Sequence, residues 1–268
     1  LKGASPWLPL PAALRFDLAL DVARGLAFLH SRGWAHLDVK DHNVLVRGLF
    51  ATAAGAEAPP PPRPVAVLAD LGSAVQFRAD GGGGGASGPD LGGDLVNKLC
   101  AGGGTSGWAA PEMLEALDDA ADAAQGAEQK ARAAARPPAD VFAFGVLLWR
   151  LLVREARPLL LVSRAAEAEE TAAGDDAEAN PWLNLDAAGL RSALAAGTAP
   201  AWPWDAGHEA TAAVGRLLRG CWAAAPFDRP AMPEVLESLE AIAASAGPWG
   251  SWAPAPAAQE EGDPADSA

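Results

Sequence analysis

The chain has 268 residues, half of them hydrophobic, and carries 34 acidic against 20 basic residues, for a formal net charge of −14. This is enough for one substantial core, and the lack of any basic block argues against nucleic acid as a partner. Two cysteines are too few for a disulfide framework or a cysteine-based zinc site, and no apolar run is long enough to span a membrane, so we expect a cytosolic or nuclear protein.

The first predicted element is an amphipathic helix from Ala12 to His30. Leucine or valine recurs every four positions over residues 14–26, which places one apolar stripe on a single helix face. Gly33 follows directly and is a natural helix stop.

Two short runs, Val44–Val46 and Val65–Leu68, predict small strands. Four consecutive prolines at 59–62 cannot form a strand, so we expect an enlarged loop between the two. Five glycines at 81–85 indicate an exposed connector. A phosphate-cradling loop is the alternative, but no strand leads into the run with the required spacing and no helix follows.

The segment Asp140–Leu152 is apolar almost all round and predicts a buried central helix. Later helices are expected at about 187–196, 209–222 and 233–244. Residues 165–179 are rich in alanine and acids without an apolar stripe, which is typical of an exposed or disordered insertion. The Pro/Ala/acid tail after Gly247 is expected to be disordered. Both acidic segments are either solvated surface or sites for basic partners.

Polar residues concentrate in the stretch HLDVKDHNVLV, residues 36–46. Taken alone, it fits a capped turn between a helix and a strand as well as a catalytic segment. Two further motifs favour the catalytic interpretation. Asp70-Leu71-Gly72 follows the second predicted strand, and Ala110-Pro111-Glu112 comes next along the chain.

These motifs resemble those of the eukaryotic protein kinase family. The family's His-Arg-Asp-Leu-Lys-x-x-Asn loop is similar to residues 36–43, with Leu37 in place of arginine, and its Asp-Phe-Gly is similar to residues 70–72. DVFAFGVLLWRLL at 140–152 and CWAAAPFDRP at 221–230 resemble two further family segments, the second typical of tyrosine kinases and tyrosine-kinase-like kinases. Five motifs in order over roughly 200 residues make chance resemblance improbable.

The resemblance implies a role for each candidate site residue. Asp38 would orient the attacking hydroxyl, and Lys40 would offset charge on the transferred phosphate. Asn43 and Asp70 would hold Mg²⁺ through hard oxygen ligands. Leu45 would lie beneath the adenine of ATP, although an aliphatic residue in a strand is equally well explained as core.

The resemblance also implies structural roles and a phosphate acceptor. Glu112 and Arg229 would form a buried ion pair, and Asp140 would hold the catalytic loop by its backbone. Lys40 is the choice of serine/threonine kinases, so we expect Ser/Thr hydroxyls of protein substrates as acceptors. Leu37 replaces the arginine that pairs with a phosphorylated activation loop in many kinases, which argues against activation by that route.

The resemblance covers only the C-terminal lobe of the family. The glycine-rich loop, strand lysine and helix glutamate of the N-terminal lobe are not found in this chain, and its first residue is leucine, so we expect a fragment. The predicted fold is therefore α+β and protein-kinase-like: a mainly α C-terminal lobe over residues 1–246 with a small β ribbon. Insertions are expected near 49–64, 79–95 and 163–180, and the tail over 247–268.

Two functions remain open on the sequence. The first is a protein serine/threonine kinase that uses ATP and Mg²⁺, of which this fragment alone would be inactive. The second is a catalytically inactive scaffold or interaction module. The intact quartet of Asp38, Lys40, Asn43 and Asp70 favours the kinase, because a scaffold needs no metal ligands.

Overall fold

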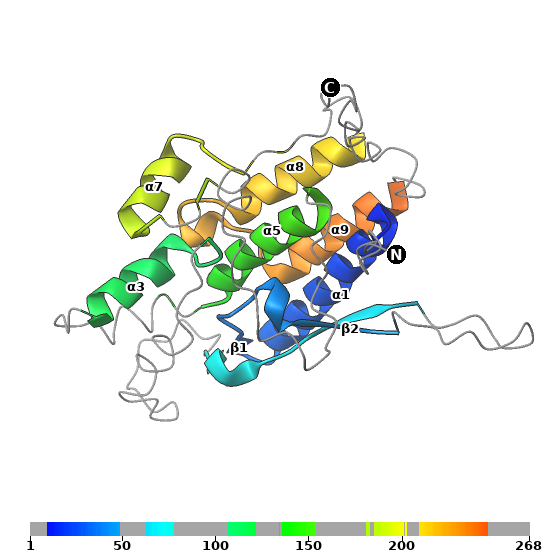
Figure 1. Cartoon of the computed structure of the whole chain (residues 1–268), viewed down its shortest axis with the longest axis horizontal. Helices are drawn as coiled ribbons and strands as arrows, with labels where there is room; N and C mark the ends of the chain where they lie inside the picture. The colour runs from blue at the N-terminus through cyan, green and yellow to red at the C-terminus, as the bar shows by residue number, and fades with distance from the viewer. Residues whose placement is uncertain are drawn as a thin grey trace, which may run out of the picture.

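The computed structural model describes residues 10–48, 63–77, 107–121, 134, 136–153, 181–182, 185–200, 202 and 209–245. Helices dominate these residues, and four of them form the body of the molecule (Figure 1). The helix α5 (Pro137–Val153) contacts both α1 (Ala12–Ser31) and α8 (Glu209–Cys221). The last helix, α9 (Met232–Ser245), packs against α1 and α8.

The central position of α5 follows from its composition. Every residue from Ala139 to Trp149 is buried, so the helix must be covered on all sides. At Gly145, an added Cβ atom would lie 2.7 Å from Nε1 of Trp222 and 2.8 Å from Cβ of Cys221. The close approach of α5 to the end of α8 therefore depends on a residue without a side chain.

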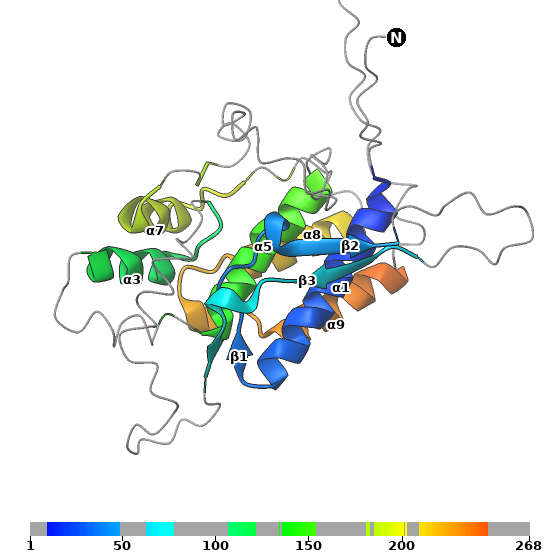
Figure 2. The ribbon, with the colours of Figure 1, turned by 60° about the horizontal axis from the view of Figure 1, so that its bottom comes forward.

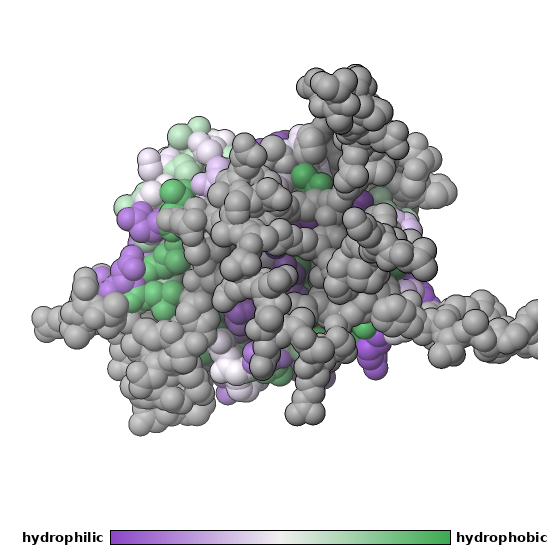
Figure 3. All heavy atoms as spheres, viewed as in Figure 1, coloured by the Kyte–Doolittle hydropathy of each residue, from purple (hydrophilic) through white to green (hydrophobic). Residues whose placement is uncertain are grey.

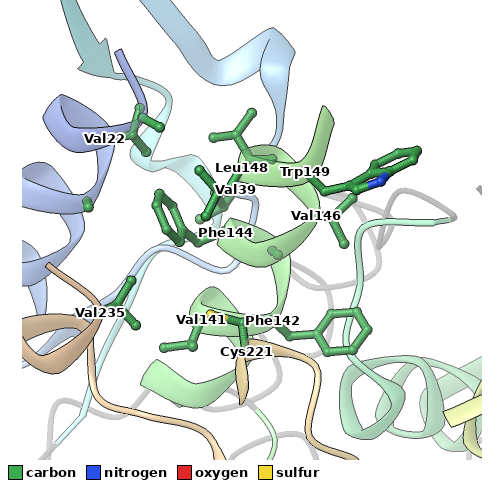
Figure 4. Close-up of a cluster of buried hydrophobic side chains, with 14 of the residues drawn as sticks. Val22, Val39, Val141, Phe142, Phe144, Val146, Leu148, Trp149, Cys221 and Val235 are labelled. Atoms are coloured by element: carbon green, nitrogen blue, oxygen red, sulfur yellow. The ribbon is translucent and has the colours of Figure 1, made fainter. Parts of the chain in front are cut away.

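Part of the polar stretch at residues 36–46 is buried in the interior of the helical body. Figure 4 shows Phe144 and Leu148 of α5 beside Val39, with Val22 of α1 nearby. Val39 is only 2% exposed. The loop around Val39 is thus anchored to the core by an apolar side chain that alternates with polar neighbours.

Two small antiparallel ribbons lie at one side of the helices (Figure 2). The strand β2 (Val44–Arg47) pairs with β3 (Val65–Leu68), with Val44 opposite Leu68, and β3 packs on α1. A second pair joins β1 (Trp34–Ala35) to β4 (Val75–Gln76). Because residues 43 and 69 directly precede β2 and follow β3, this register brings the two polar motifs to the same end of the ribbon.

The helices α3 (Pro111–Ala121) and α7 (Ala187–Ala195) contact each other and lie at the left of Figure 1. The side chain of Asp186 caps α7 by accepting a hydrogen bond from the backbone N–H of Gly189 at 2.7 Å. Both helices lie at the edge of the four-helix body.

The sequence-based assignments of these elements are confirmed with small shifts at their ends. The first helix extends to Ser31, and Gly33 adopts φ of 76° just beyond it, as its role as a helix stop requires. The β ribbon and the buried helix are present, as are the three later helices. The sequence did not predict α3 or the β1–β4 pair.

Several predictions concern residues that lie outside the described part of the chain. These are the five-glycine connector, the acidic insertion at 165–179, most of the other two insertions, and the tail. Within the described residues, no helix combines the length and the apolar character needed to cross a membrane.

Candidate active site

The carboxylate of Asp140 on α5 binds the backbone of the loop formed by residues 36–43. The backbone N–H groups of His36 and Leu37 donate to its two oxygens, each at 2.7 Å. His30 of α1 places its Nε2 2.8 Å from the same carboxylate. Asp140 is 1% exposed, so these partners satisfy a charge that burial would otherwise make costly. The expected role of Asp140 is confirmed.

Leu37 takes an unusual backbone conformation at this point. Its φ is 64°, in the left-handed region that residues with a side chain rarely adopt. Such strain costs about 1–3 kcal/mol and persists only where the surroundings impose it. Here the two hydrogen bonds to Asp140 and the packing of the Leu37 side chain against the core hold the turn.

Three of the predicted site residues are brought into direct contact. Oδ2 of Asp38 lies 3.0 Å from Nζ of Lys40 and accepts a hydrogen bond from Nδ2 of Asn43 at 2.7 Å. The same Nδ2 donates to the backbone carbonyl of Asp38 at 2.8 Å. Oδ1 of Asp38 has no partner among the described residues. One carboxylate oxygen is therefore fixed and the other is available.

The same contacts orient the amide of Asn43. Because Nδ2 points at Asp38, the amide oxygen Oδ1 faces away from it and accepts no hydrogen bond from the described residues. Asn43 is only 7% exposed. An oriented, buried amide oxygen of this kind is the hard ligand that Mg²⁺ takes.

Asp70 approaches the loop through the backbone of the β2–β3 ribbon. The N–H of the preceding Ala69 donates to the carbonyl of Asn43 at 2.8 Å. Asp70 has φ of 61°, and its Oδ1 accepts from the N–H of Gly72 at 3.1 Å. The ring Nε2 of His36 also lies 3.0 Å from the carbonyl oxygen of Ala69, so both the ribbon and the loop hold the backbone that leads into Asp70.

Leu45 lies on β2 opposite Val67 and is 36% exposed. Leu45 is therefore not a core residue, because the side chain that this strand buries is the neighbouring Val44, which is 1% exposed. An apolar side chain at the surface of the ribbon is compatible with a ligand contact there.

Sequence reasoning missed two residues that hold the loop. One is His30, described above; the other is Arg150, whose Nε lies 3.1 Å from Oδ2 of Asp41 and whose guanidinium lies 5.4 Å from the ring centre of Trp108. Both carried a signal, because His30 ends an amphipathic helix at a polar position and Arg150 interrupts an otherwise apolar helix. Among the described residues, no three His, Cys, Asp or Glu side chains form a metal cluster.

The predicted ion pair between Glu112 and Arg229 is confirmed. Nη1 and Nη2 of Arg229 lie 2.6 Å and 2.9 Å from the two oxygens of Glu112, in the bidentate geometry that favours arginine. The Arg229 side chain is fully buried. The pair ties the start of α3 to the segment between α8 and α9.

Comparison with known proteins assigns the chain to a family. The model described as "Protein kinase domain" matches residues 11–239, so the chain belongs to the protein kinase family. The helical body with small antiparallel ribbons agrees with a kinase-like fold. The absence of an N-terminal lobe stays a prediction.

Individual relatives cover the chain to different extents. A probable LIM domain-containing serine/threonine-protein kinase of Dictyostelium discoideum is 22% identical over 86% of the chain and 24% of its own length. The serine/threonine-protein kinase mos of Xenopus laevis is 27% identical over 88% of the chain and 49% of its length. Human dual specificity testis-specific protein kinase 1 is 32% identical over 54% of the chain and 17% of its length. The chain thus spans half or less of each.

Proposed function

We propose that this chain carries the catalytic loop and metal ligands of a protein kinase that transfers the γ-phosphate of ATP to Ser/Thr hydroxyls of protein substrates. The observation that carries the proposal is the set of contacts made by the Asp38 carboxylate. Its Oδ2 is occupied by Lys40 and Asn43, while Oδ1 has no partner among the described residues. A fixed carboxylate with one available oxygen is what an incoming hydroxyl needs as its hydrogen-bond acceptor.

The contact between Lys40 and Asp38 indicates a role for Lys40 in the same reaction. The Lys40 ammonium group lies 3.0 Å from the Asp38 carboxylate, and we propose that it contacts the phosphate during transfer. Phosphoryl transfer proceeds through a loose transition state, so the protein contributes chiefly by positioning the reactants and offsetting negative charge. Lys40 supplies this charge, and Asp38 orients the nucleophile.

Asn43 and Asp70 fit the requirements of a Mg²⁺ site. The Asn43 amide oxygen is directed away from Asp38, and Ala69, the residue before Asp70, donates its N–H to the carbonyl of Asn43. Mg²⁺ bound there would neutralise charge on the phosphate oxygens of ATP. Leu45, exposed on the same ribbon, is proposed to contact the adenine.

The preference for Ser/Thr rests on Lys40 and on the relatives, two of which are named serine/threonine-protein kinases. At the position of the phosphate-binding arginine, Leu37 packs on the core instead. We therefore propose that phosphorylation of the activation loop does not act through this position.

The test is Mg²⁺-dependent transfer of labelled phosphate from ATP to a generic protein substrate, measured for the full-length product of the gene. Asp38→Asn keeps the size of the side chain but removes the charge and should abolish transfer. Glu237→Gln makes the same chemical change at an exposed position of α9 and should leave the rate unchanged. Equal rates for wild type and Asp38→Asn would exclude the proposed role of Asp38.

The chain of residues 1–268 should transfer phosphate poorly by itself, because the glycine loop and strand lysine are not found in it. Robust Asp38-dependent transfer by this chain alone would contradict that expectation. If no Mg²⁺-dependent transfer is detected from the full-length protein either, the scaffold function replaces the kinase function.

A further inference from the structure

A groove lies away from the catalytic loop, between α3, α7 and the short helix η3 (Pro226–Asp228). It is an open groove of about 770 Å³, within the roughly 300–1,000 Å³ typical of ligand pockets. None of Asp38, Lys40, Asn43 or Asp70 lines it.

The groove contains an aromatic side chain that is almost fully exposed to solvent. Phe227 on η3 lines it and is 92% exposed, the most exposed of the large hydrophobic residues in the described part of the chain. Ala116, Pro138 and Pro226 add further apolar surface to the lining. An apolar patch rimmed by polar residues marks an interaction site more often than a single exposed aromatic does. Figure 3 shows hydrophobic and hydrophilic residues side by side over α3 and α7.

The charge around this apolar surface is mainly negative. Five carboxylates and two guanidinium groups line the groove. Two of the carboxylates are already paired, because Glu112 binds Arg229 and Glu115 binds Arg191. The Glu115 hydrogen bonds raise the pKa of Arg191. Asp118 is exposed and has no ion-pair partner among the described residues, so its charge is available to a partner.

We propose that this groove docks a basic segment of a partner protein, with an apolar side chain packed on Phe227 and basic side chains facing the carboxylates of Asp118 and Asp186. Aromatic anchors surrounded by complementary charge are typical of docking sites. The proposal concerns binding alone and holds whether or not the chain transfers phosphate.

Charge complementarity decides among the alternative occupants. A second copy of the chain carries a net charge of −14 and would be repelled from an acidic groove. The acidic stretch at 167–178 of the same chain would be repelled for the same reason. A basic partner is attracted, and the attraction should weaken with salt.

The experiment is a fluorescence-anisotropy titration of the chain with a labelled synthetic peptide that alternates arginine pairs with leucine. A version with serine for leucine, and one with glutamate for arginine, serve as matched probes. We expect saturable, salt-sensitive binding of the first peptide only. Phe227→Ser and Asp118→Lys should each weaken it by about tenfold or more. Neither change touches the core, since both side chains are exposed.

Two control variants separate docking from general attraction to an acidic protein. Phe28→Ser removes another exposed aromatic, 61% exposed on α1, and Glu237→Lys reverses an exposed charge on α9; both should leave the affinity unchanged. Equal loss in test and control variants would overturn the proposal. Sedimentation should show a monomer; a dimer that Phe227→Ser dissociates would assign the groove to a second copy and likewise overturn it.

Discussion

Replacing Arg229 by methionine tests how the fold depends on the pair with Glu112. The arginine also donates Nε to the carbonyl of Ala223 and Nη1 to that of Pro138, each at 2.9 Å, and lies 5.1 Å from the ring centre of Phe142. Methionine keeps the apolar length but removes every donor. Glu112, whose side chain is 12% exposed, would then be an unpaired, largely buried charge.

Breaking a buried pair on one side costs about 3–5 kcal/mol of unfolding free energy. This is a large part of the roughly 5–15 kcal/mol available to a domain. For a domain of this size, each kcal/mol corresponds to about 2–4 °C, so Tm should fall by about 6–20 °C. Urea unfolding followed by tryptophan fluorescence gives the free energy, and calorimetry gives Tm.

A double-variant cycle identifies the cause. Glu112→Met combined with Arg229→Met removes both charges, and this variant should be more stable than Arg229→Met alone. Arg191→Met is the matched control, because its pair with Glu115 is exposed at 41% and 44% and should contribute only about 0–1 kcal/mol. If the two changes at 112 and 229 are additive, or if Arg229→Met costs no more than Arg191→Met, the buried pair does not act as reasoned.

Three further predictions concern the interior. Gly145→Ala should lower the unfolding free energy in urea by about 1–3 kcal/mol, because the new methyl group meets Trp222 and Cys221; an unchanged midpoint would mean that α8 shifts freely. Asp140→Asn should speed amide hydrogen exchange at His36 and Leu37, whose N–H groups bind its carboxylate, and unchanged protection at both would refute this. Burial raises the pKa of Cys221 from 9.0 to about 12, so in a Cys100→Ser background the native thiol should resist disulfide reagents near neutral pH. The unfolded thiol ionises first, so stability should fall as pH rises from about 9 to about 12, and Cys221→Ala should lack this loss.

Local patterns predicted much of the architecture. The four-residue recurrence over residues 14–26 and the apolar segment from Asp140 to Leu152 gave α1 and α5 correctly, because helix periodicity and burial are encoded by neighbouring residues. The missed α3 is short, with its apolar residues Met113, Ala116 and Leu117 confined to about two turns, and it packs on α7, some 70 residues away. Strands as short as β1 and β4 are formed by pairing rather than by propensity.

For the candidate site, too, the sequence predicted some features and the tertiary structure determined the others. The sequence by itself determined which residues are present: Asp38, Lys40 and Asn43 at fixed spacing, Asp70 after a strand, and motifs sufficient to indicate a kinase. Only the tertiary structure decided that Asn43 points its amide nitrogen at Asp38, that His30 and Asp140 hold the strained turn at Leu37, and that Phe227 lies exposed above an acidic groove. Spacing along a chain fixes local geometry, whereas the direction of a side chain is set by partners that packing brings from a hundred residues away.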